Sequence, residues 1–320
     1  MSRLFLGRVL MAAVGIVVAL IAVASWTMVS QAVVAEREPV EVTPLDYEMA
    51  YEDIEFSPRM PEQRAEENPI TLRGWWIPGP ARDNDTESAI IVVHGLDSNR
   101  ARDPDLYMPL IRDLRDRSFS VIMFDLRAHG ESDGEIMSAG YFERYDVLGA
   151  MDVVETRYGI PAERIGVLGF SMGGVAALLG ATEEPRLRAL VVDSAFANID
   201  DLFASEVADR TPLPEWTIGV LKPGMEIVAR VRYGIPLSAL KPEEFVGELD
   251  IPLLLTHSED DDRIATDHSE RIAAAATHPE TRLKSFPSGG HSAAFSDHPV
   301  AYLDAVTEYF HWRFESGSAN

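Results

Sequence analysis

The chain has 320 residues and no cysteine, so disulfide bonds, thiolate nucleophiles and cysteine-based metal sites are all excluded. Lysine is scarce too, since it occurs only at positions 222, 241 and 284. Lysine and arginine together number 28 against 52 acidic residues, which gives a formal net charge of −24. We expect no nucleic-acid partner, because the phosphates would be repelled. The acidic excess is typical of a well-solvated surface.

Charge is missing altogether from residues 9–35, where Val, Ala, Ile and Leu dominate. About 20 apolar residues span a bilayer, so this stretch is long enough to cross one. Arg3 and Arg8 precede it, and such a positive flank favours the cytoplasm. We therefore expect residues 1–35 to form a cytoplasmic tip and a transmembrane signal-anchor, with the rest of the chain on the extracytoplasmic side. The alternative is a cleaved signal peptide and a secreted protein, since residues 33–35 resemble a cleavage site.

After the apolar run the pattern becomes that of a folded domain. Residues 36–69 are rich in Glu and Pro, and we expect a linker that leads into the first strands. Short apolar runs then alternate with helical patterns over residues 70–314. This alternation predicts an α/β fold, with a mostly parallel sheet, right-handed crossovers and helices on both faces. The expected strands are 71–77, 89–93, 119–124, 165–170, 189–192, 251–256 and 282–286, and the expected helices are 106–117, 142–158, 173–181, 267–276 and 300–314.

The interval 197–247 breaks this rhythm. It contains several prolines and two amphipathic pieces, 216–221 and 225–231, so we expect a small helical lid inserted after a strand of the core. Its large apolar side chains either line an acyl pocket or form the core of the lid itself. They are Phe203, Trp216, Ile218, Leu221 and Met225. Residues 315–320 are expected to be a frayed tail.

The most informative motif is Gly-x-Ser-x-Gly at residues 169–173. An expected strand runs into it and an expected helix follows it. A serine on such a sharp turn is held in a strained backbone conformation that exposes its Oγ at the edge of the sheet. Glycines are needed there because the neighbouring chain approaches too closely for a Cβ atom. We therefore predict Ser171 as a nucleophile.

A serine hydroxyl needs a base, which is usually histidine because its pKa lies near neutrality. Of the eight histidines, His291 follows Gly289-Gly290 and a short strand, on a loop that can reach the edge of the sheet. We choose His291 as the base. His298 is the nearest competitor, although Pro299 and the following helix indicate a capping role.

The base needs a carboxylate to hold its tautomer. The acid is expected on the loop at residues 257–264, which has the sequence His-Ser-Glu-Asp-Asp-Asp-Arg-Ile. Asp261 is our choice because Ile264 can anchor the loop, while Asp260, Asp262 and, more remotely, Asp193 stay open. This loop lacks the spaced oxygens and turn glycine of a calcium loop, so no metal is expected.

The oxyanion formed from an attacked carbonyl needs preorganised donors. One is expected to be the backbone N–H of Met172, directly after the nucleophile. The second is expected from the loop after the strand 89–93, where we assign the N–H of Leu96. Gly95 supplies the backbone freedom for that turn, and the His94 side chain is expected to be structural.

These residues together resemble the α/β-hydrolase superfamily over residues 70–314. The chain order Ser, Asp, His is similar to that family, and so is the strand followed by His94-Gly95. The family commonly has Asp-x-Arg-Gly-x-Gly-x-Ser where this chain has Asp-Leu-Arg-Ala-His-Gly-Glu-Ser at 125–132, so we expect Arg127 and His129 to be structural. The acid loop resembles His-Gly-x-x-Asp, with Ser258 in place of the glycine.

The resemblance is strongest to small-lid serine hydrolases related to the prolyl-oligopeptidase catalytic domain and to membrane-anchored thioesterase-like enzymes. It implies a serine hydrolase that cleaves a carboxylic ester or thioester of a small or lipid-like acyl substrate through an acyl-enzyme, without a cofactor. A peptidase or acyltransferase with the same triad is one alternative, and a non-catalytic binding or scaffold protein is another. Dehalogenase and epoxide-hydrolase relatives have aspartate at the position of Ser171, so they are less similar.

Overall fold

The computed structural model describes residues 3–59, 70–80, 87–101, 103–202 and 216–316. The chain forms two compact units. We call them the sheet unit, made of Ala35–Asn198 and Leu240–Asn320, and the helical unit, made of Met1–Val34 and Ile199–Ala239. The predicted site residues 96, 171, 172, 261 and 291 all belong to the sheet unit.

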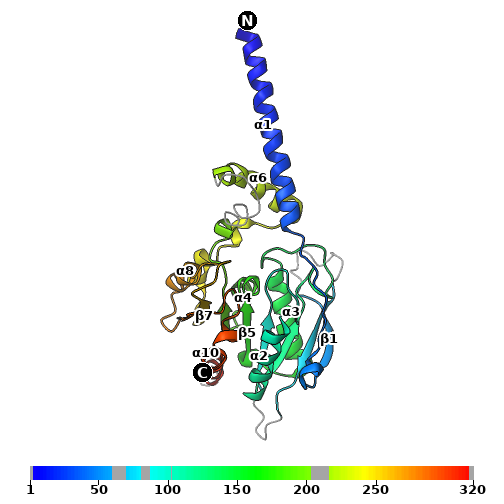
Figure 1. The fold of residues 1–320 in the computed structure, drawn as a ribbon, viewed down its shortest axis with the longest axis vertical. Coiled ribbons are helices and arrows are strands. Elements are labelled where there is room, and N and C mark those ends of the chain that lie inside the picture. The colour runs from blue at the N-terminus through cyan, green and yellow to red at the C-terminus, as the bar shows by residue number, and fades with distance from the viewer. Residues whose placement is uncertain (1–2, 60–69, 81–86, 102, 203–215, 317–320) are drawn as a thin grey trace. The chain divides into compact units, whose positions relative to one another are not determined.

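The sheet unit is built on one sheet with the strand order β1-β2-β4-β3-β5-β6-β7-β8 (Figure 1). Strand β2 is antiparallel to both of its neighbours, and the strands from β4 to β8 run parallel. The central strands are buried on both faces, which explains their continuous apolar sequences. The strands are β1 (Glu52–Phe56), β2 (Leu72–Ile77), β3 (Ala89–Val93), β4 (Ser120–Phe124), β5 (Ile165–Phe170), β6 (Leu190–Asp193), β7 (Leu253–Ser258) and β8 (Arg282–Phe286).

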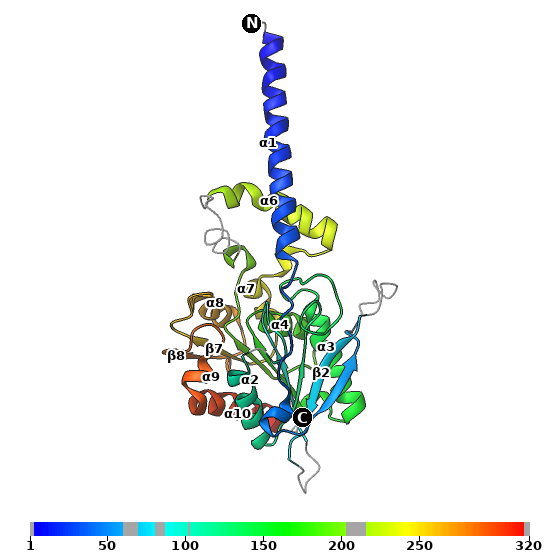
Figure 2. The same cartoon turned by 45° about the vertical axis from the view of Figure 1, so that its right-hand side comes forward.

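Helices cover both faces of this sheet. Alternate residues of β5 point to opposite faces, so Gly166 lies against Phe310 of α10 whereas Gly169 lies against the start of α4. Figure 2 shows α2 beside α10. Helices α3 and α4 pack together on the other face. Among the described residues of this unit, the α-helices are α2 (Pro104–Asp116), α3 (Glu143–Tyr158), α4 (Met172–Glu183), α7 (Pro242–Phe245), α8 (Asp267–Ala275), α9 (Ala294–Asp297) and α10 (Pro299–Ser316), and the 3₁₀ turns are η1 (Pro44–Tyr47), η3 (Ala162–Arg164) and η5 (Val246–Glu248).

In the part of the helical unit that the structure describes, helix α1 (Arg3–Ala32) pairs with helix α6 (Trp216–Tyr233), and the turn η4 (Leu237–Ala239) follows α6. Helix α6 packs along the C-terminal part of α1 (Figures 1 and 2). The Ser25 hydroxyl donates to the Leu221 carbonyl at 3.2 Å, and the Tyr233 hydroxyl donates to Ser30 Oγ at 3.0 Å. Gly224 faces Ser25, where a Cβ atom would collide with the serine side chain.

The predicted fold class is confirmed, because strands and helices alternate as expected and most element boundaries agree within three residues. One detail differs. The pieces expected at 216–221 and 225–231 form a single helix with Pro223 inside it. Strand β1 lies in the segment 36–69, where the first strands are expected, and residues 36–39 make specific contacts that are described below. Parts of both segments, residues 60–69 and 203–215 with Phe203, lie outside the described residues, as does the side chain of Trp216. The lid and the domain boundaries stay predictions.

Candidate active site

Ser171 stands on a strained turn between β5 and α4. Its backbone has φ 51° and ψ −118°, a conformation that side-chain-bearing residues rarely adopt. The turn is held on one side by the Ser171 N–H, which donates to the Asp193 carbonyl at 2.7 Å. On the other side a Cβ atom on Gly173 would lie 2.5 Å from the Val93 carbonyl oxygen, and one on Gly169 would lie 2.6 Å from the Gly173 carbonyl oxygen. Both glycines are therefore required by close backbone approach, as the sequence predicts.

His291 reaches Ser171 from the loop after β8. Its Nε2 lies 3.0 Å from Ser171 Oγ and its Nδ1 lies 2.8 Å from Asp261 Oδ2. Gly289 precedes it with φ 134°, in a position where a Cβ atom would collide with the backbone of Ala294. The loop is fixed further by the Gly290 N–H, which donates to Asp260 Oδ1 at 2.8 Å. A hydrogen-bonded chain therefore runs from Ser171 through His291 to Asp261, which is the arrangement that activates a serine.

Asp261 lies on the loop after β7 with its side chain fully buried. Its Oδ1 accepts hydrogen bonds from the backbone N–H groups of Arg263 and Ile264, at 3.0 and 2.9 Å. Burial opposes the charged form, but the hydrogen bonds from His257 and His291 outweigh it and hold the pKa of Asp261 well below its usual range. The carboxylate is therefore ionised at neutral pH and available to stabilise a positive charge on His291.

His257 is a second histidine on the same carboxylate, and the sequence did not single it out. Its Nε2 lies 3.2 Å from Asp261 Oδ2 and 2.8 Å from the Ile264 carbonyl oxygen. Since both partners are acceptors, Nε2 carries a proton. Its Nδ1 lies 2.7 Å from Ser269 Oγ. The imidazole is completely buried, which opposes its charged form, but the bonds to Asp261 and Ile264 prevail and raise the pKa of His257.

The other candidate acids and the competing histidine have different partners. Asp193 Oδ2 accepts hydrogen bonds from Thr256 and Tyr302, at 2.7 and 2.9 Å, and burial raises the pKa of this carboxyl. Asp260 binds the Gly290 N–H, as described above, and Asp262 is exposed. His298 follows α9 as its C-terminal cap, and its Nε2 lies 3.2 Å from Ser288 Oγ.

The loop after β3 carries the predicted oxyanion donor Leu96 and lies against the serine. A Cβ atom on Gly95 would be 3.2 Å from Ser171 Cβ. The Leu126 N–H donates to Nε2 of His94 at 3.0 Å, so this nitrogen carries no proton. The proton is therefore on Nδ1, which donates to the Gly95 carbonyl oxygen at 2.7 Å. This bond fixes the peptide plane that contains the Leu96 N–H, which gives His94 a positioning role.

Met172 is the first residue of α4, and a helix leaves its first N–H groups without carbonyl partners. Its amide and the amide of Leu96 therefore remain the two candidate donors for an oxyanion. Their participation stays a prediction.

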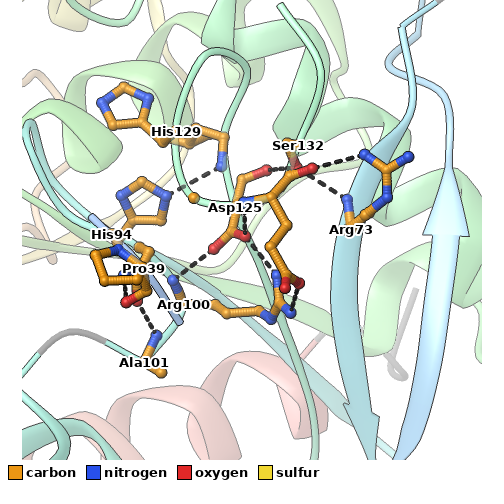
Figure 3. A network of polar contacts seen from close by, with 12 residues as sticks. Pro39, Arg73, His94, Arg100, Ala101, Asp125, His129 and Ser132 are labelled. Carbon is orange, nitrogen blue, oxygen red and sulfur yellow. Dashed lines mark hydrogen bonds and ion pairs between the residues drawn. The ribbon is translucent and has the colours of Figure 1, made fainter. Parts of the chain in front are cut away.

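A buried polar network braces the two loops that follow β3 and β4 (Figure 3). The Arg100 guanidinium pairs with Asp125 and with Glu131, and the Arg100 N–H donates to Asp125 Oδ1 at 2.7 Å. Ser132 Oγ donates to the Asp125 carbonyl at 2.6 Å and accepts from the Arg73 N–H of β2 at 2.9 Å. The loop that carries Leu96 is therefore fixed to the body of the sheet.

Arg127 and His129 have structural contacts, as expected from the sequence. Arg127 Nε donates to Asp146 Oδ1 at 3.0 Å, and Asp146 is fully buried. His129 is fully buried and its Nδ1 lies 2.8 Å from the Arg127 carbonyl oxygen. Within the described part of the chain, no three His, Asp or Glu side chains gather where they would hold a metal ion.

Comparison with known proteins gives a consistent picture. The family model described as serine aminopeptidase, S33, matches residues 84–234. The uncharacterized protein YfhR of Escherichia coli K12 is 30% identical over 242 residues, which cover 74% of this chain and 75% of YfhR. The uncharacterized protein YqkD of Bacillus subtilis is 28% identical over 71% of this chain and 72% of its own length.

Among solved structures, the esterase Pf2001 of Pyrococcus furiosus is similar with a TM-score of 0.68 and 25% sequence identity. The match covers 87% of this chain and 98% of the esterase. It therefore extends well beyond the region that the family model matches.

Proposed function

This chain belongs to the α/β-hydrolase superfamily of serine hydrolases, and on that premise we propose that it cleaves a carboxylic ester or thioester through an acyl-enzyme on Ser171. The observation that carries this proposal is the chain of contacts from Ser171 to His291 at 3.0 Å and from His291 to Asp261 at 2.8 Å. A similar solved structure that is an esterase supports an ester over an amide as the substrate.

In the first half of the reaction, Ser171 Oγ attacks the acyl carbon while His291 Nε2 takes its proton. The Oγ–acyl bond forms, and the tetrahedral oxyanion is held by the N–H groups of Met172 and Leu96. The bond to the leaving alcohol or thiol then breaks, and His291 returns the proton to that group. Asp261 keeps Nδ1 protonated and stabilises the imidazolium throughout.

In the second half, a water molecule takes the place of the alcohol. His291 accepts a proton from the water as it attacks the acyl carbon, and returns that proton to Ser171 Oγ as the bond from this oxygen to the acyl carbon breaks. The products are a free carboxylic acid and a regenerated serine. Every proton is moved by residues of this chain, so the proposal requires no cofactor or metal.

A serine peptidase is the second candidate, because the matching family model is described as a serine aminopeptidase. Both candidates use the same triad and differ only in the leaving group. Rates on matched nitrophenyl esters, thioesters and aminoacyl nitroanilides separate them. A preference for the anilides by kcat/KM would favour the peptidase.

We also propose that α1 anchors the protein in a membrane, with the sheet unit on the extracytoplasmic side. Residues Gly7–Ala32 form a helix with a mean hydropathy of 2.6 in its most apolar window, and only 6% of that window is buried. The mass of protein extracted from membranes tests this proposal directly. An intact N-terminus supports an anchor, whereas loss of residues 1–35 indicates a cleaved signal peptide.

Fluorophosphonate labelling tests the nucleophile. We expect the intact chain to be labelled and Ser171→Ala to be unlabelled. Ser88→Ala is the control, because Ser88 directly precedes β3 at the opposite edge of the parallel strands. Unlabelled wild-type protein, or labelling that survives in Ser171→Ala, would contradict the proposal.

A further inference from the structure

The segment directly after α1 is docked on the sheet unit. Arg37 donates from Nη1 to the carbonyl oxygens of Gly130 and Ser132, at 2.9 and 2.7 Å, and from Nη2 to that of Gly134 at 2.8 Å. These carbonyls belong to the loop after β4. Several convergent bonds to a guanidinium fix the backbone more firmly than one flexible contact does. We call residues 36–39 the docked segment.

The docked segment also binds the loop after β3. The Glu36 N–H donates to Asp97 Oδ1 at 3.1 Å, and Asp97 is the residue next to Leu96. Asn99, which is only 2% exposed, donates from Nδ2 to the carbonyl oxygens of Glu38 and Pro39, at 3.1 and 3.0 Å. Since the strands from β4 to β8 run parallel, both loops lie at the edge of the sheet that carries Ser171. We call it the catalytic edge.

Chain length alone then limits how far the catalytic edge can lie from the end of α1. Four residues lead from Ala32 to Glu36, and an extended chain of that length spans at most about 14 Å. The 26 residues Gly7–Ala32 make a helix about 39 Å long, against about 40–45 Å for a bilayer with its headgroups. A helix that spans the bilayer therefore ends in or near the headgroup layer, and the docked segment follows immediately.

Helix α6 also supports a membrane surface at the C-terminal end of α1. It packs on the C-terminal part of α1, where Ser25 and Ser30 provide its hydrogen bonds. It nevertheless leaves apolar side chains uncovered, since Val220 is 46%, Ile227 62% and Val231 81% exposed. Its remaining exposed positions include three cations, Lys222, Arg230 and Arg232. Exposed apolar residues among exposed cations are typical of a helix that lies in a lipid headgroup layer.

We propose that the substrate is an amphiphilic ester held in the membrane leaflet, and that the docked segment keeps the catalytic edge within reach of it. This inference rests on the proposed hydrolase function and on α1 as an anchor. It adds to the proposed function a class of substrate and a role for the docked segment. A soluble substrate needs no fixed distance to the bilayer, whereas an ester with its acyl chain in the leaflet needs the serine near the surface.

The activity test lengthens the tether of the full chain in phosphatidylcholine vesicles. A Gly-Ser segment of about 20 residues inserted between Val34 and Ala35 adds about 25 Å of root-mean-square reach without altering a docking contact. We expect turnover of a long-chain fluorogenic ester dissolved in the vesicles to fall about fivefold or more, while a water-soluble acetate ester is hydrolysed at the wild-type rate. The same segment appended after Asn320 is the control. Unchanged turnover of both esters, or an equal loss on both, would overturn the proposal.

The second test measures geometry and needs no substrate. Because the chain has no cysteine, a single introduced cysteine is labelled uniquely. Glu135→Cys marks the exposed surface of the loop after β4 at the catalytic edge, and Glu163→Cys marks the exposed turn before β5 at the opposite edge. A strand of six residues separates two edges by about 20 Å. We expect stronger energy transfer to a headgroup-labelled lipid from position 135, and we expect the Gly-Ser insertion to abolish the difference.

The two tests separate the failure of this inference from that of the proposed function. If wild-type protein hydrolyses neither ester, the hydrolase proposal fails. If it hydrolyses the soluble ester but transfer from positions 135 and 163 is equal, the membrane-facing catalytic edge is wrong and the hydrolase stands.

Discussion

Replacing Asp261 with asparagine exchanges one carboxylate oxygen for an NH₂ group, and it should turn His291 Nε2 from an acceptor into a donor. Asp261 Oδ1 accepts two backbone N–H groups, so the asparagine oxygen is expected to stay at that position. Its NH₂ group then faces His291 Nδ1, where Oδ2 stood 2.8 Å away. Two donors cannot share that contact, so His291 must become the Nε2–H tautomer. That tautomer cannot accept the proton of Ser171.

The size of the effect follows from this reversal. A triad with the wrong histidine tautomer loses about 10⁴ in kcat, or about 5.5 kcal/mol in the barrier. Asp260→Asn is the matched comparison, because the asparagine oxygen can still accept from the Gly290 N–H at about the present distance of 2.8 Å. Asp262→Asn alters an exposed side chain. We expect both neighbouring variants to stay within about fivefold of wild type, the effect of losing one ordinary hydrogen bond.

Steady-state hydrolysis of a nitrophenyl ester by the three variants, with thermal unfolding as a check on folding, measures this difference. The KM should change little in Asp261→Asn, since the loss lies in the chemical step. The reasoning is refuted if folded Asp261→Asn keeps more than about a tenth of the activity, or if Asp260→Asn or Asp262→Asn loses as much.

Three further predictions concern the turn after Ser171, the carboxylate of Asp261 and an ion pair at the C-terminal end of α4. Gly173→Ala places a methyl group 2.5 Å from a carbonyl oxygen at the end of β3 and should lower the free energy of unfolding by about 1–3 kcal/mol. Gly180→Ala is the control in the same helix, because its methyl group meets nothing closer than 3.6 Å. Equal melting temperatures of the two variants would contradict this prediction. His257→Leu removes one donor from the triad carboxylate, and we expect kcat to fall about tenfold at pH 8, with an unchanged kcat as the opposing result. Glu184 has its pKa lowered to about 2 from an ordinary 4.5, chiefly by the Arg186 hydrogen bond, so its contribution to stability is complete above about pH 4.5 and is lost as the pH falls towards 2. Glu184→Gln should flatten the dependence of the melting temperature on pH in that interval.

The sequence predicted where the strands lie along the chain and which candidate site residues follow them. Buried parallel strands and a Gly-x-Ser-x-Gly turn leave strong local patterns. The sequence did not predict that His257 contacts Asp261, although the pattern His-Gly-x-x-Asp that resembles the acid loop begins at this histidine. The docking of Arg37 left no pattern either. Its partners are backbone carbonyls, which every residue has, so no side-chain signal in the sequence identifies them.

The pairing of α6 with α1 was missed for a related reason. Residues 33–215 separate the two helices, and neither the apolar run of α1 nor the amphipathic pieces of α6 identify their partner. Periodicity shows that a helix buries one face but not what covers that face. The interval 197–247 was therefore interpreted only as a lid, and its contact with α1 emerged from the structure.

The position of His291 in the chain has a consequence for biosynthesis. The base follows the serine by 120 residues along the chain. A ribosome adds roughly 5–20 residues each second, so the half-made protein passes many seconds with its serine present and its base still unmade. If the sheet unit is exported, as we propose, the chain is inert while it is being threaded across the membrane, because Ser171 crosses before His291. The proposed hydrolysis can then begin only after His291 has arrived on the far side and the sheet unit has folded.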